Sequence, residues 1–277
     1  MTVWIGISGW RYPRWRGTFY PHGLPQREEL RYAAERMNSV EINGSFYSLQ
    51  RRSYFEQWVA STPDDFVFAV KGGRFITHMK KLRDIETPLA NFFASGVLAL
   101  DRKLGPILWQ LPPNLGFDAE RMNEFLAQLP RNAGSAADIA ADHDQRIPDD
   151  QALIKAAHPR RRLRHAIEVR HDSFRSPEFY QLLRRHHMAL VISDNPGRWP
   201  IFTEITTDLM YVRLHGHSEL YASGYSDREL DEWATKIRSW VERGCDVYVY
   251  FDNDAKVHAP FDAISLMHRL ELSRQPS

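Results

Sequence analysis

The stretch Tyr211-Val212-Arg213-Leu214-His215 alternates polar or charged side chains with apolar ones. Side chains of a β-strand point to opposite faces in turn, so Tyr211, Arg213 and His215 share one face and the two residues between them share the other. The same alternation returns in Tyr248-Val249-Tyr250-Phe251-Asp252. This pattern predicts strands with a charged face near their carboxyl ends and an apolar face that packs beneath helices.

Eight short runs rich in Val, Ile, Tyr and Phe are bounded by Gly, Pro, Asp or Asn and are predicted as strands. They cover residues 3–9, 39–43, 66–71, 106–111, 165–170, 189–194, 210–215 and 246–252. Apolar residues recur at helical spacing between these runs. The predicted helices cover residues 26–37, 53–60, 88–99, 119–129, 177–187, 227–243 and 260–270. Ser226-Asp227-Arg228-Glu229 has the pattern of a capping box at the start of the sixth helix.

Strands that alternate with helices need crossover connections, which give a parallel sheet. Eight strands in 277 residues predict an α/β fold, a single (β/α)8 TIM-type barrel, because that fold takes roughly 250 residues. An open doubly wound sheet is the alternative, but Ser8-Gly9-Trp10-Arg11-Tyr12 is not a dinucleotide-binding fingerprint. We predict one domain over residues 1–277. The polar stretch 130–163 is predicted to be a surface insertion before strand five, and the link 195–208 to be a loop.

Composition excludes several classes of protein. The chain is 43% hydrophobic and 26% charged, which excludes a disordered chain. Its 36 basic and 35 acidic residues give a net charge of +1, so bulk attraction to nucleic acid or to an acidic membrane is not expected. One cysteine excludes a disulfide framework within the chain. No apolar run reaches the ~18 residues of a membrane span, and residues 1–6 resemble a strand rather than a secretion signal, so we expect a cytoplasmic protein.

Polar side chains gather at the carboxyl ends of the predicted strands when the alternation is applied to each of them. They are Ser8, Glu41, Asn43, Lys71, Gln110, Glu168, Arg170, Asp194, Arg213, His215 and Asp252. Barrels of this kind normally fill their interior with Val, Ile and Leu, and barrel enzymes place their sites at this end. Burying unpaired ions costs several kcal/mol each, so the cluster predicts a functional site. The alternative is a network of ion pairs in which four carboxylates and three cations satisfy one another.

We predict that Glu41, Lys71, Glu168 and Asp252 are catalytic. Two carboxyl groups can work as an acid–base pair, and a lysine in a dry site can serve as a base or a Schiff-base amine. Each of these residues has the alternative of merely holding an oppositely charged partner. The residues predicted to bind substrate are Ser8, Trp10, Tyr12, Asn43, His78, Gln110, Arg170, His171, Asp194, Arg213, His215 and Asn253.

Two features refine these roles. Arg170 and Arg213 suit a bidentate clamp on a carboxylate or a phosphate. Trp10 and Tyr12 follow the first strand together with Trp15, Phe19 and Tyr20. These aromatic residues either cover the site and stack on a sugar or base, or pack their own loop.

No cofactor is predicted, and no residue is assigned as a metal ligand. A divalent metal is the alternative, because Glu168, Asp194, His215 and Asp252 would form a carboxylate-plus-histidine set for a hard cation. No metal-binding spacing such as HExxH supports that set.

Short motifs in a fixed order also resemble a known family. They are Gly6-Ile7-Ser8-Gly9-Trp10, Phe19-Tyr20-Pro21, Val40-Glu41-Ile42-Asn43, Ser45-Phe46-Tyr47, Phe68-Ala69-Val70-Lys71, Ile76-Thr77-His78, Gln110-Leu111-Pro112-Pro113, Glu168-Val169-Arg170-His171, Tyr211-Val212-Arg213-Leu214-His215-Gly216 and Tyr250-Phe251-Asp252-Asn253-Asp254. In this order they resemble the YecE-like family, also called Domain of Unknown Function 72. The resemblance covers nearly the whole chain and implies a TIM-type barrel. It implies no activity, so no catalytic residue is carried over from it.

We therefore expect an enzyme that acts on a small polar, sugar-like or anionic substrate by carboxylate and lysine acid–base chemistry at the carboxyl-terminal mouth of the barrel. The reaction class stays open between hydrolysis, isomerisation and elimination. One alternative is a metal-dependent phosphoester hydrolase, including one that acts on nucleic acid. Another is a non-catalytic protein that binds a small anion. The expected partner is a small molecule that bears a phosphate or a carboxylate, with no membrane and no nucleic acid.

Overall fold

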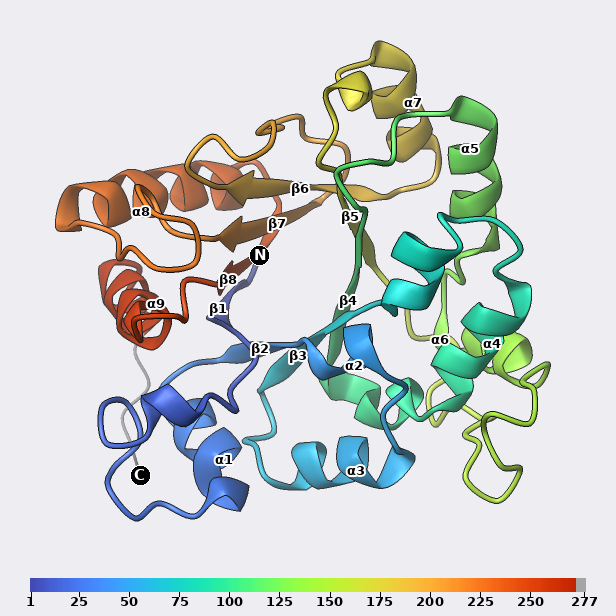
Figure 1. Ribbon diagram of the computed structural model, residues 1–277, viewed down its shortest axis with the longest axis horizontal. Coiled ribbons are helices and arrows are strands. Elements are labelled where there is room, and N and C mark those ends of the chain that lie inside the picture. Colours follow the sequence, from blue (N-terminus) through green and yellow to red (C-terminus); the bar gives the residue numbers. More distant parts are fainter. Residues whose placement is uncertain (273–277) are drawn as a thin grey trace. The chain divides into compact units, whose positions relative to one another are not determined.

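The structure is a computed structural model that describes residues 1–272. Eight parallel strands form a closed barrel in chain order, so the predicted (β/α)8 barrel is confirmed (Figure 1). The strands are β1 (Val3–Ser8), β2 (Ser39–Ile42), β3 (Val67–Lys71), β4 (Leu104–Gln110), β5 (His165–Glu168), β6 (Ala189–Asp194), β7 (Leu209–Leu214) and β8 (Asp246–Phe251). Each of them overlaps a predicted strand.

The chain divides into two compact units. Unit 1 comprises Met1–Glu41, Ser61–Val67 and Ala189–Ser277, and unit 2 comprises Ile42–Ala60 and Phe68–Met188. In unit 1, β6, β7, β8, β1 and the start of β2 pair in that order. In unit 2, β3 pairs with β4 and β4 with β5. One domain over residues 1–277 stays a prediction.

Helices connect the strands. They are α1 (Glu29–Ala34), α2 (Gly44–Tyr47), α3 (Arg52–Ala60), α4 (Glu86–Ala94), α5 (Ala119–Gln128), α6 (Ala133–Ala140), α7 (Pro177–Arg185), α8 (Asp227–Glu242) and α9 (His258–Arg269). The capping box of α8 is confirmed, because the side chains of Ser226 and Glu229 each accept from the other residue's amide. None of the described helices is both long and apolar enough to cross a membrane.

Two helices are shorter than predicted, each for a local reason. Residues 26–28 form a 3-10 turn before α1, and α1 ends early. Just beyond its end, Asn38 accepts from the amide of Ile5 at 2.7 Å and donates to the carbonyl of Val3 at 2.9 Å, which joins this segment to β1. The predicted helix 88–99 stops after Ala94, because Gly96 adopts a φ of 123° that no α-helix continues.

The prediction that residues 130–163 lie on the surface is wrong for their first third. Asn132 caps α6 by accepting from the amide of Ser135 at 2.8 Å. Ala136 and Ala140 of this helix are fully buried, and α6 packs against α4. Alanine side chains allow such close packing, so a stretch that reads as Ala-rich and polar places one apolar face in the interior. The predicted loop 195–208 is confirmed.

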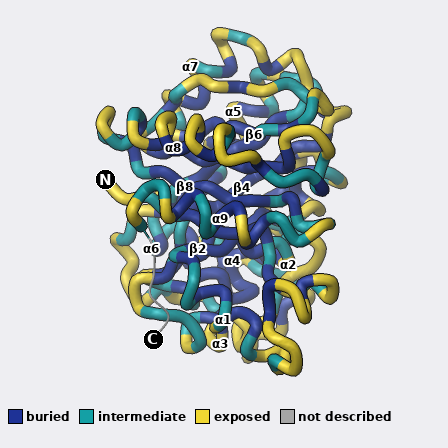
Figure 2. The backbone as a smooth tube through the Cα atoms, turned by 90° about the vertical axis from the view of Figure 1, so that its left-hand side faces the viewer, coloured by how far each residue is buried: buried dark blue, intermediate teal, exposed yellow. Residues whose placement is uncertain are grey.

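The strands labelled in Figure 2 are largely buried, whereas the outer turns of α8 are exposed. In unit 1 three inward residues are aromatic: Tyr211 of β7 and Tyr248 and Tyr250 of β8. Tyr211 stacks on Tyr248 with ring centroids 6.5 Å apart and lies 5.3 Å from Tyr250. The hydroxyl of Tyr250 lies 2.7 Å from that of Ser39. These rings form a floor beneath the charged residues at the strand ends.

The close approach of Gly6 in β1 to the backbone of β2 gives a test. A Cβ on Gly6 would lie 1.8 Å from the carbonyl oxygen of Ser39, which faces it across β1 and β2. We expect Gly6→Ala to lower the free energy of unfolding by at least about 3 kcal/mol, because backbone must move to admit the methyl group. Gly73→Ala is the matched control, since its Cβ would be 3.8 Å from its nearest neighbour. Urea denaturation that gives both variants the same stability would contradict this packing.

Candidate functional site

Unit 1 contains a buried group that we call the arginine cluster: Ser8, Glu41, Tyr211, Arg213 and Asp252. The guanidinium of Arg213 holds Glu41 with two hydrogen bonds, from Nε at 3.1 Å and from Nη2 at 2.9 Å. The hydroxyl of Ser8 donates to Glu41 at 2.9 Å, and that of Tyr211 at 2.6 Å. Glu41 therefore accepts four hydrogen bonds, two on each carboxylate oxygen.

Strand register explains why these side chains meet. Ser8 lies opposite Glu41 in the pairing of β1 with β2. Tyr211 and Arg213 are two residues apart on β7, so both point to the same side. The alternation predicted that Ser8, Glu41 and Arg213 share one face, and the hydrogen bonds confirm it.

Asp252 is the accessible end of the cluster. Nη2 of Arg213 donates to its Oδ2 at 2.9 Å, and Nδ1 of His215 lies 3.0 Å from the same oxygen. The side chain of Asp252 is 15% exposed, whereas those of Glu41 and Arg213 are 0% and 1% exposed. A ligand that approached the cluster would meet Asp252 before it met Glu41.

Asp254, which from the sequence is only part of a family motif with no role of its own, is a second carboxyl close to Asp252. Burial, and then the charge of Asp252, raises its pKa to about 6. Tyr12 lies near this carboxyl, and its hydroxyl donates to the carbonyl of Ser8 at 2.5 Å. Burial, and then the same carboxyl groups, raises the pKa of Tyr12 as well, so it stays protonated. The signal available in the sequence was the Asp-Asn-Asp spacing after β8.

The charge balance in unit 1 bears on the predicted anion clamp. Arg213 does bind a carboxylate bidentately, but it is that of Glu41, and the same guanidinium also donates to Asp252. Four carboxyl groups, those of Glu41, Asp194, Asp252 and Asp254, lie at the ends of β2, β6 and β8 with this guanidinium, and the charge of Arg14 also acts on Asp254. An anion would be repelled here, whereas a neutral hydroxyl would find hydrogen-bond acceptors.

The remaining predicted residues of unit 1 have structural partners. Asp194, which is partly exposed, accepts from the hydroxyl of Tyr225 at 2.8 Å. The amide of Asn253 donates to Asp262 at 2.8 Å and to the carbonyl of Ser223 at 2.9 Å. Asn253 is fully buried and ties the loop after β8 to α9, and the prediction that it contacts substrate stays a prediction.

The aromatic residues after β1 mostly pack their own loop. Trp15 and Tyr20 are fully buried and Phe19 nearly so, and the ring of Trp15 meets those of Phe19 and Tyr20 with centroids 5.7 and 6.0 Å apart. Trp10 is 6% exposed, and its carbonyl accepts from Tyr20. Tyr12 is the most exposed of these rings on the side of the arginine cluster.

Unit 2 contains another group, which we call the histidine cluster: Phe46, Lys71, His78 and Gln110. The Lys71 ammonium lies 4.3 Å above the ring of Phe46, and that ring meets His78 edge-on with centroids 5.1 Å apart. The amide nitrogen of Gln110 lies 3.4 Å from Nε2 of His78. Nδ1 of His78 lies 2.8 Å from the hydroxyl of Thr77. These contacts fit a neutral imidazole that accepts at Nε2 and donates at Nδ1.

Cations surround His78. Burial first, then the charges of Lys71, Arg170 and Arg74, lower its pKa to about 4, and Glu168 opposes this effect. His78 is thus a neutral side chain at neutral pH in a positive potential. Its segment, residues Phe75–Met79, is a π-helix, a form of turn that is common at functional sites.

Other predicted residues of unit 2 lie at the ends of β2 and β5. Glu168 is fully buried, and its Oε1 accepts from Nε and Nη2 of Arg170 at 2.7 and 2.6 Å. The side-chain oxygen of Asn43 is buried and has no hydrogen-bond partner among residues 1–272. His171 is exposed, and it caps the 3-10 turn that follows by accepting from the amide of Ser173 at 3.2 Å.

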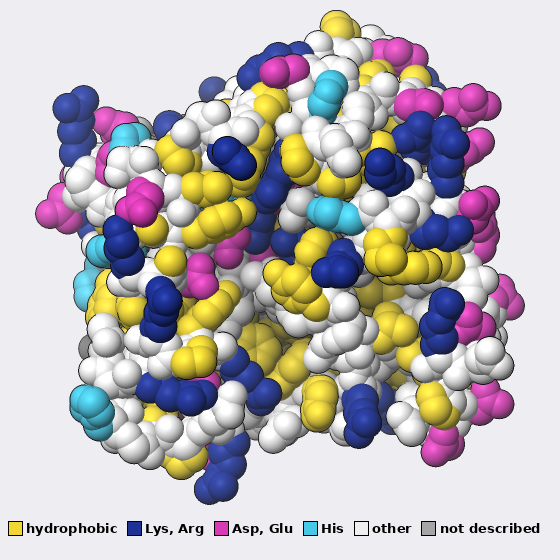
Figure 3. All heavy atoms as spheres, in the orientation of Figure 1, with side chains coloured by type: hydrophobic (Ala, Val, Ile, Leu, Met, Phe, Trp, Pro, Cys, Tyr) yellow, Lys and Arg dark blue, Asp and Glu magenta, His cyan; other side chains and the backbone are white. Residues whose placement is uncertain are grey.

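A metal site has no geometric support from the described residues. In that part of the chain, no three His, Cys, Asp or Glu side chains are grouped closely enough to hold a metal ion. Asp194 instead contacts Tyr225, and Asp252 contacts Arg213 and His215. On the face drawn in Figure 3, acidic and basic side chains are interspersed, so this face has no extended area of one sign of charge.

Comparisons with known proteins agree with the fold. A family model described as "Protein of unknown function DUF72" matches residues 4–277, which confirms the resemblance of the sequence motifs. The UPF0759 protein YunF of Bacillus subtilis is 23% identical over 98% of this chain and 95% of its own. The UPF0759 protein YecE of Escherichia coli K12 is 24% identical over 86% of this chain and 82% of its own. The crystal structure of a DUF72 family protein of Thermotoga maritima matches with a TM-score of 0.75 and 26% identity, over 98% of this chain and all of that one.

The cations around His78 give a test by NMR. We expect its imidazole to titrate near pH 4, and Lys71→Met to move its pKa up towards 6.5 because one repelling charge is lost. Since the folded pKa lies below the unfolded one, the unfolded chain takes up the proton first. The stability that comes from the neutral His78 side chain is therefore fully present above pH 6.5 and is lost as the pH falls towards 4.

Lys155→Met removes a charge from an exposed loop position and serves as the control for Lys71→Met. It should leave the His78 titration unchanged. A His78 pKa near 6.5 in the wild type, or one that Lys71→Met does not raise, would contradict the described geometry.

Proposed function

The chain belongs to the DUF72 family, and from the arginine cluster we propose that it is an enzyme acting on a small, neutral, sugar-like substrate by carboxylate acid–base chemistry. The observation that carries this proposal is the accessible carboxyl of Asp252, which a buried Arg213–Glu41 pair fixes beside a second carboxyl of raised pKa. Two carboxyl groups in contrasting surroundings are the usual means of dividing acid and base roles.

Asp252 is the base. Its contact with the Arg213 guanidinium favours the ionised form, and its exposed fraction gives it access to a substrate hydroxyl or to a water molecule. Asp254 is the acid, because burial keeps part of its population protonated near pH 6. One proton passes from the substrate or water to Asp252, and another passes from Asp254 to the departing or rearranging oxygen.

Glu41 is a positioning residue in this scheme. Both of its carboxylate oxygens accept hydrogen bonds from Ser8, Tyr211 or Arg213, and its side chain is fully buried, so it does not contact the substrate in this scheme. Its role is to orient Arg213, which in turn orients Asp252. Lys71 and Glu168 lie in unit 2, and their predicted catalytic roles stay proposals that this scheme does not use.

Small-anion binding is the second candidate function, and the histidine cluster favours it. Lys71 and Arg170 both act on the neutral imidazole of His78, and Asn43 offers a buried acceptor beside α2. An anion such as a monobasic phosphate would be attracted by these charges.

Proton NMR in D2O tests the enzyme proposal with a panel of monosaccharides and p-nitrophenyl glycosides. Loss of a C–H signal by exchange with deuterium reports isomerisation or elimination, and release of p-nitrophenol reports hydrolysis. We expect turnover of at least one compound, and we expect Asp252→Asn to lower it by about 10² or more because a positioned base is lost. The wild-type rate should fall as the pH rises through about 6. Asp254→Asn should abolish this pH dependence of the rate.

Asp64→Asn is the control, since Asp64 is an exposed carboxyl of unit 1, and its rate should equal that of the wild type. If the wild-type protein turns over no compound in the panel, the enzyme proposal gives way to binding. If turnover survives in Asp252→Asn, the assignment of the base is wrong.

A further inference from the structure

Unit 2 contains a cavity of about 260 Å³ that is distinct from the histidine cluster. Nine side chains and backbone segments line it: Ser48, Leu49, Gly73, Phe75, Ile76, Pro88, Asn91, Phe92 and Arg146. They come from the turn after α2, the π-helix and the residues just before it, α4, and the loop after α6. Neither the predicted site residues nor the proposed acid–base chemistry accounts for this cavity.

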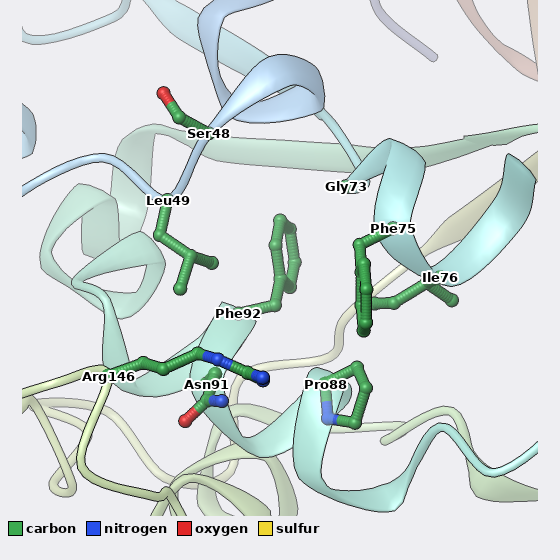
Figure 4. A pocket seen from close by; sticks show the side chains of 9 residues that line it. All are labelled: Ser48, Leu49, Gly73, Phe75, Ile76, Pro88, Asn91, Phe92 and Arg146. Atoms are coloured by element: carbon green, nitrogen blue, oxygen red, sulfur yellow. The ribbon is translucent and has the colours of Figure 1, made fainter. Parts of the chain in front are cut away.

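The walls of the cavity are apolar and partly aromatic. Figure 4 shows the rings of Phe75 and Phe92 and the side chain of Leu49 bordering the same space, with Pro88 at one edge. Phe75 is 39% exposed and Leu49 is 38% exposed. Exposure of large apolar side chains to water is unfavourable, and the free energy falls when an apolar ligand covers them.

Arg146 is the charged residue among these nine, and Figure 4 shows its side chain reaching towards Pro88. Its guanidinium carbon lies 5.8 Å from the centroid of the Phe75 ring. The loop that presents it is fixed, because Asp144 exchanges two hydrogen bonds of 3.0 Å with Asn91. Asp144 also accepts from the amide of Arg146 at 2.9 Å. The guanidinium lies 3.5 Å from the Asp144 carboxylate, and its side chain is 60% exposed. The guanidinium of Arg146 therefore keeps N–H donors for a second carboxylate.

Size and charge together define the ligand. A cavity of about 150 Å³ is enough to hold benzene, so about 260 Å³ leaves room for a ring and one polar group. We propose that this cavity binds a small aromatic carboxylic acid, with its ring between Leu49, Phe75 and Phe92 and its carboxylate on Arg146. The proposal does not depend on the acid–base chemistry of unit 1.

The backbone around the cavity supports a binding role rather than incidental loose packing. Phe75 and Ile76 belong to the same π-helix as His78. The turn that follows holds Lys81, Leu82 and Asp84 at positive φ, of 49°, 70° and 47°, which is costly for residues other than glycine. Backbone of this kind persists where its surroundings hold it and is concentrated at ligand sites.

Benzoate is the probe, with benzyl alcohol as its uncharged counterpart, and binding is followed by the amide resonances of the full-length protein. We expect benzoate to shift the resonances of Phe75 and Ile76 with roughly millimolar affinity, as befits a ligand of this size. Arg146→Gln should weaken benzoate roughly fivefold, as expected for a partly exposed ion pair, and should leave benzyl alcohol unchanged. Phe75→Ala should weaken both compounds.

Arg228→Gln is the matched control, because Arg228 is an exposed arginine of unit 1 whose side chain is 89% exposed. It should bind benzoate like the wild type. The proposal is overturned if benzoate produces no shift at Phe75 or Ile76, if Phe75→Ala binds it normally, or if Arg146→Gln and Arg228→Gln bind it equally well.

Discussion

The buried ion pair between Glu41 and Arg213 is the interaction on which the charged interior of unit 1 depends. Removing both groups from water costs several kcal/mol per ion, and the structure offsets this cost with a bidentate contact and with hydroxyl donors from Ser8 and Tyr211. If Arg213 were lost, Glu41 would be an uncompensated buried charge, and if Glu41 were lost, Arg213 would keep Asp252 as its partner. A cluster kept only for stability could use apolar residues instead, so its retention fits a role in orienting Asp252.

Much of this cluster could be predicted from the sequence, because the two-residue period of a strand decides which side chains share a face. That rule placed Ser8, Glu41 and Arg213 together, and the hydrogen bonds confirm it. It could not show that the partners of Arg213 are the protein's own carboxylates, since pairing depends on register between strands. Asp254 was missed because its pKa depends on burial in a loop, which no local pattern encodes. The burial of α6 was missed because alanine suits both a surface and a close helix contact.

The two units differ in the charge that they present. Carboxyl groups outnumber the guanidinium in the arginine cluster, whereas cations lower the pKa of the neutral His78 in the histidine cluster. Hydroxylated ligands suit the former, and anions suit the latter. The family match and the barrel specify where such groups lie but not what they act on, because one fold supports many chemistries. The aromatic cavity beside the π-helix adds a ligand chemistry that neither cluster offers.

A double-mutant cycle on Glu41→Gln and Arg213→Met, followed by urea denaturation, tests the buried pair most directly. Arg213→Met should lower the free energy of unfolding by about 3–5 kcal/mol, because it strands the buried charge of Glu41. Glu41→Gln should cost less, because Asp252 still pairs with Arg213. The double variant should lose less than the sum of the two, since the buried carboxylate is removed together with its partner. Losses that add to within about 0.5 kcal/mol would show that the two residues act independently, and Arg213 would then owe its position to something other than Glu41.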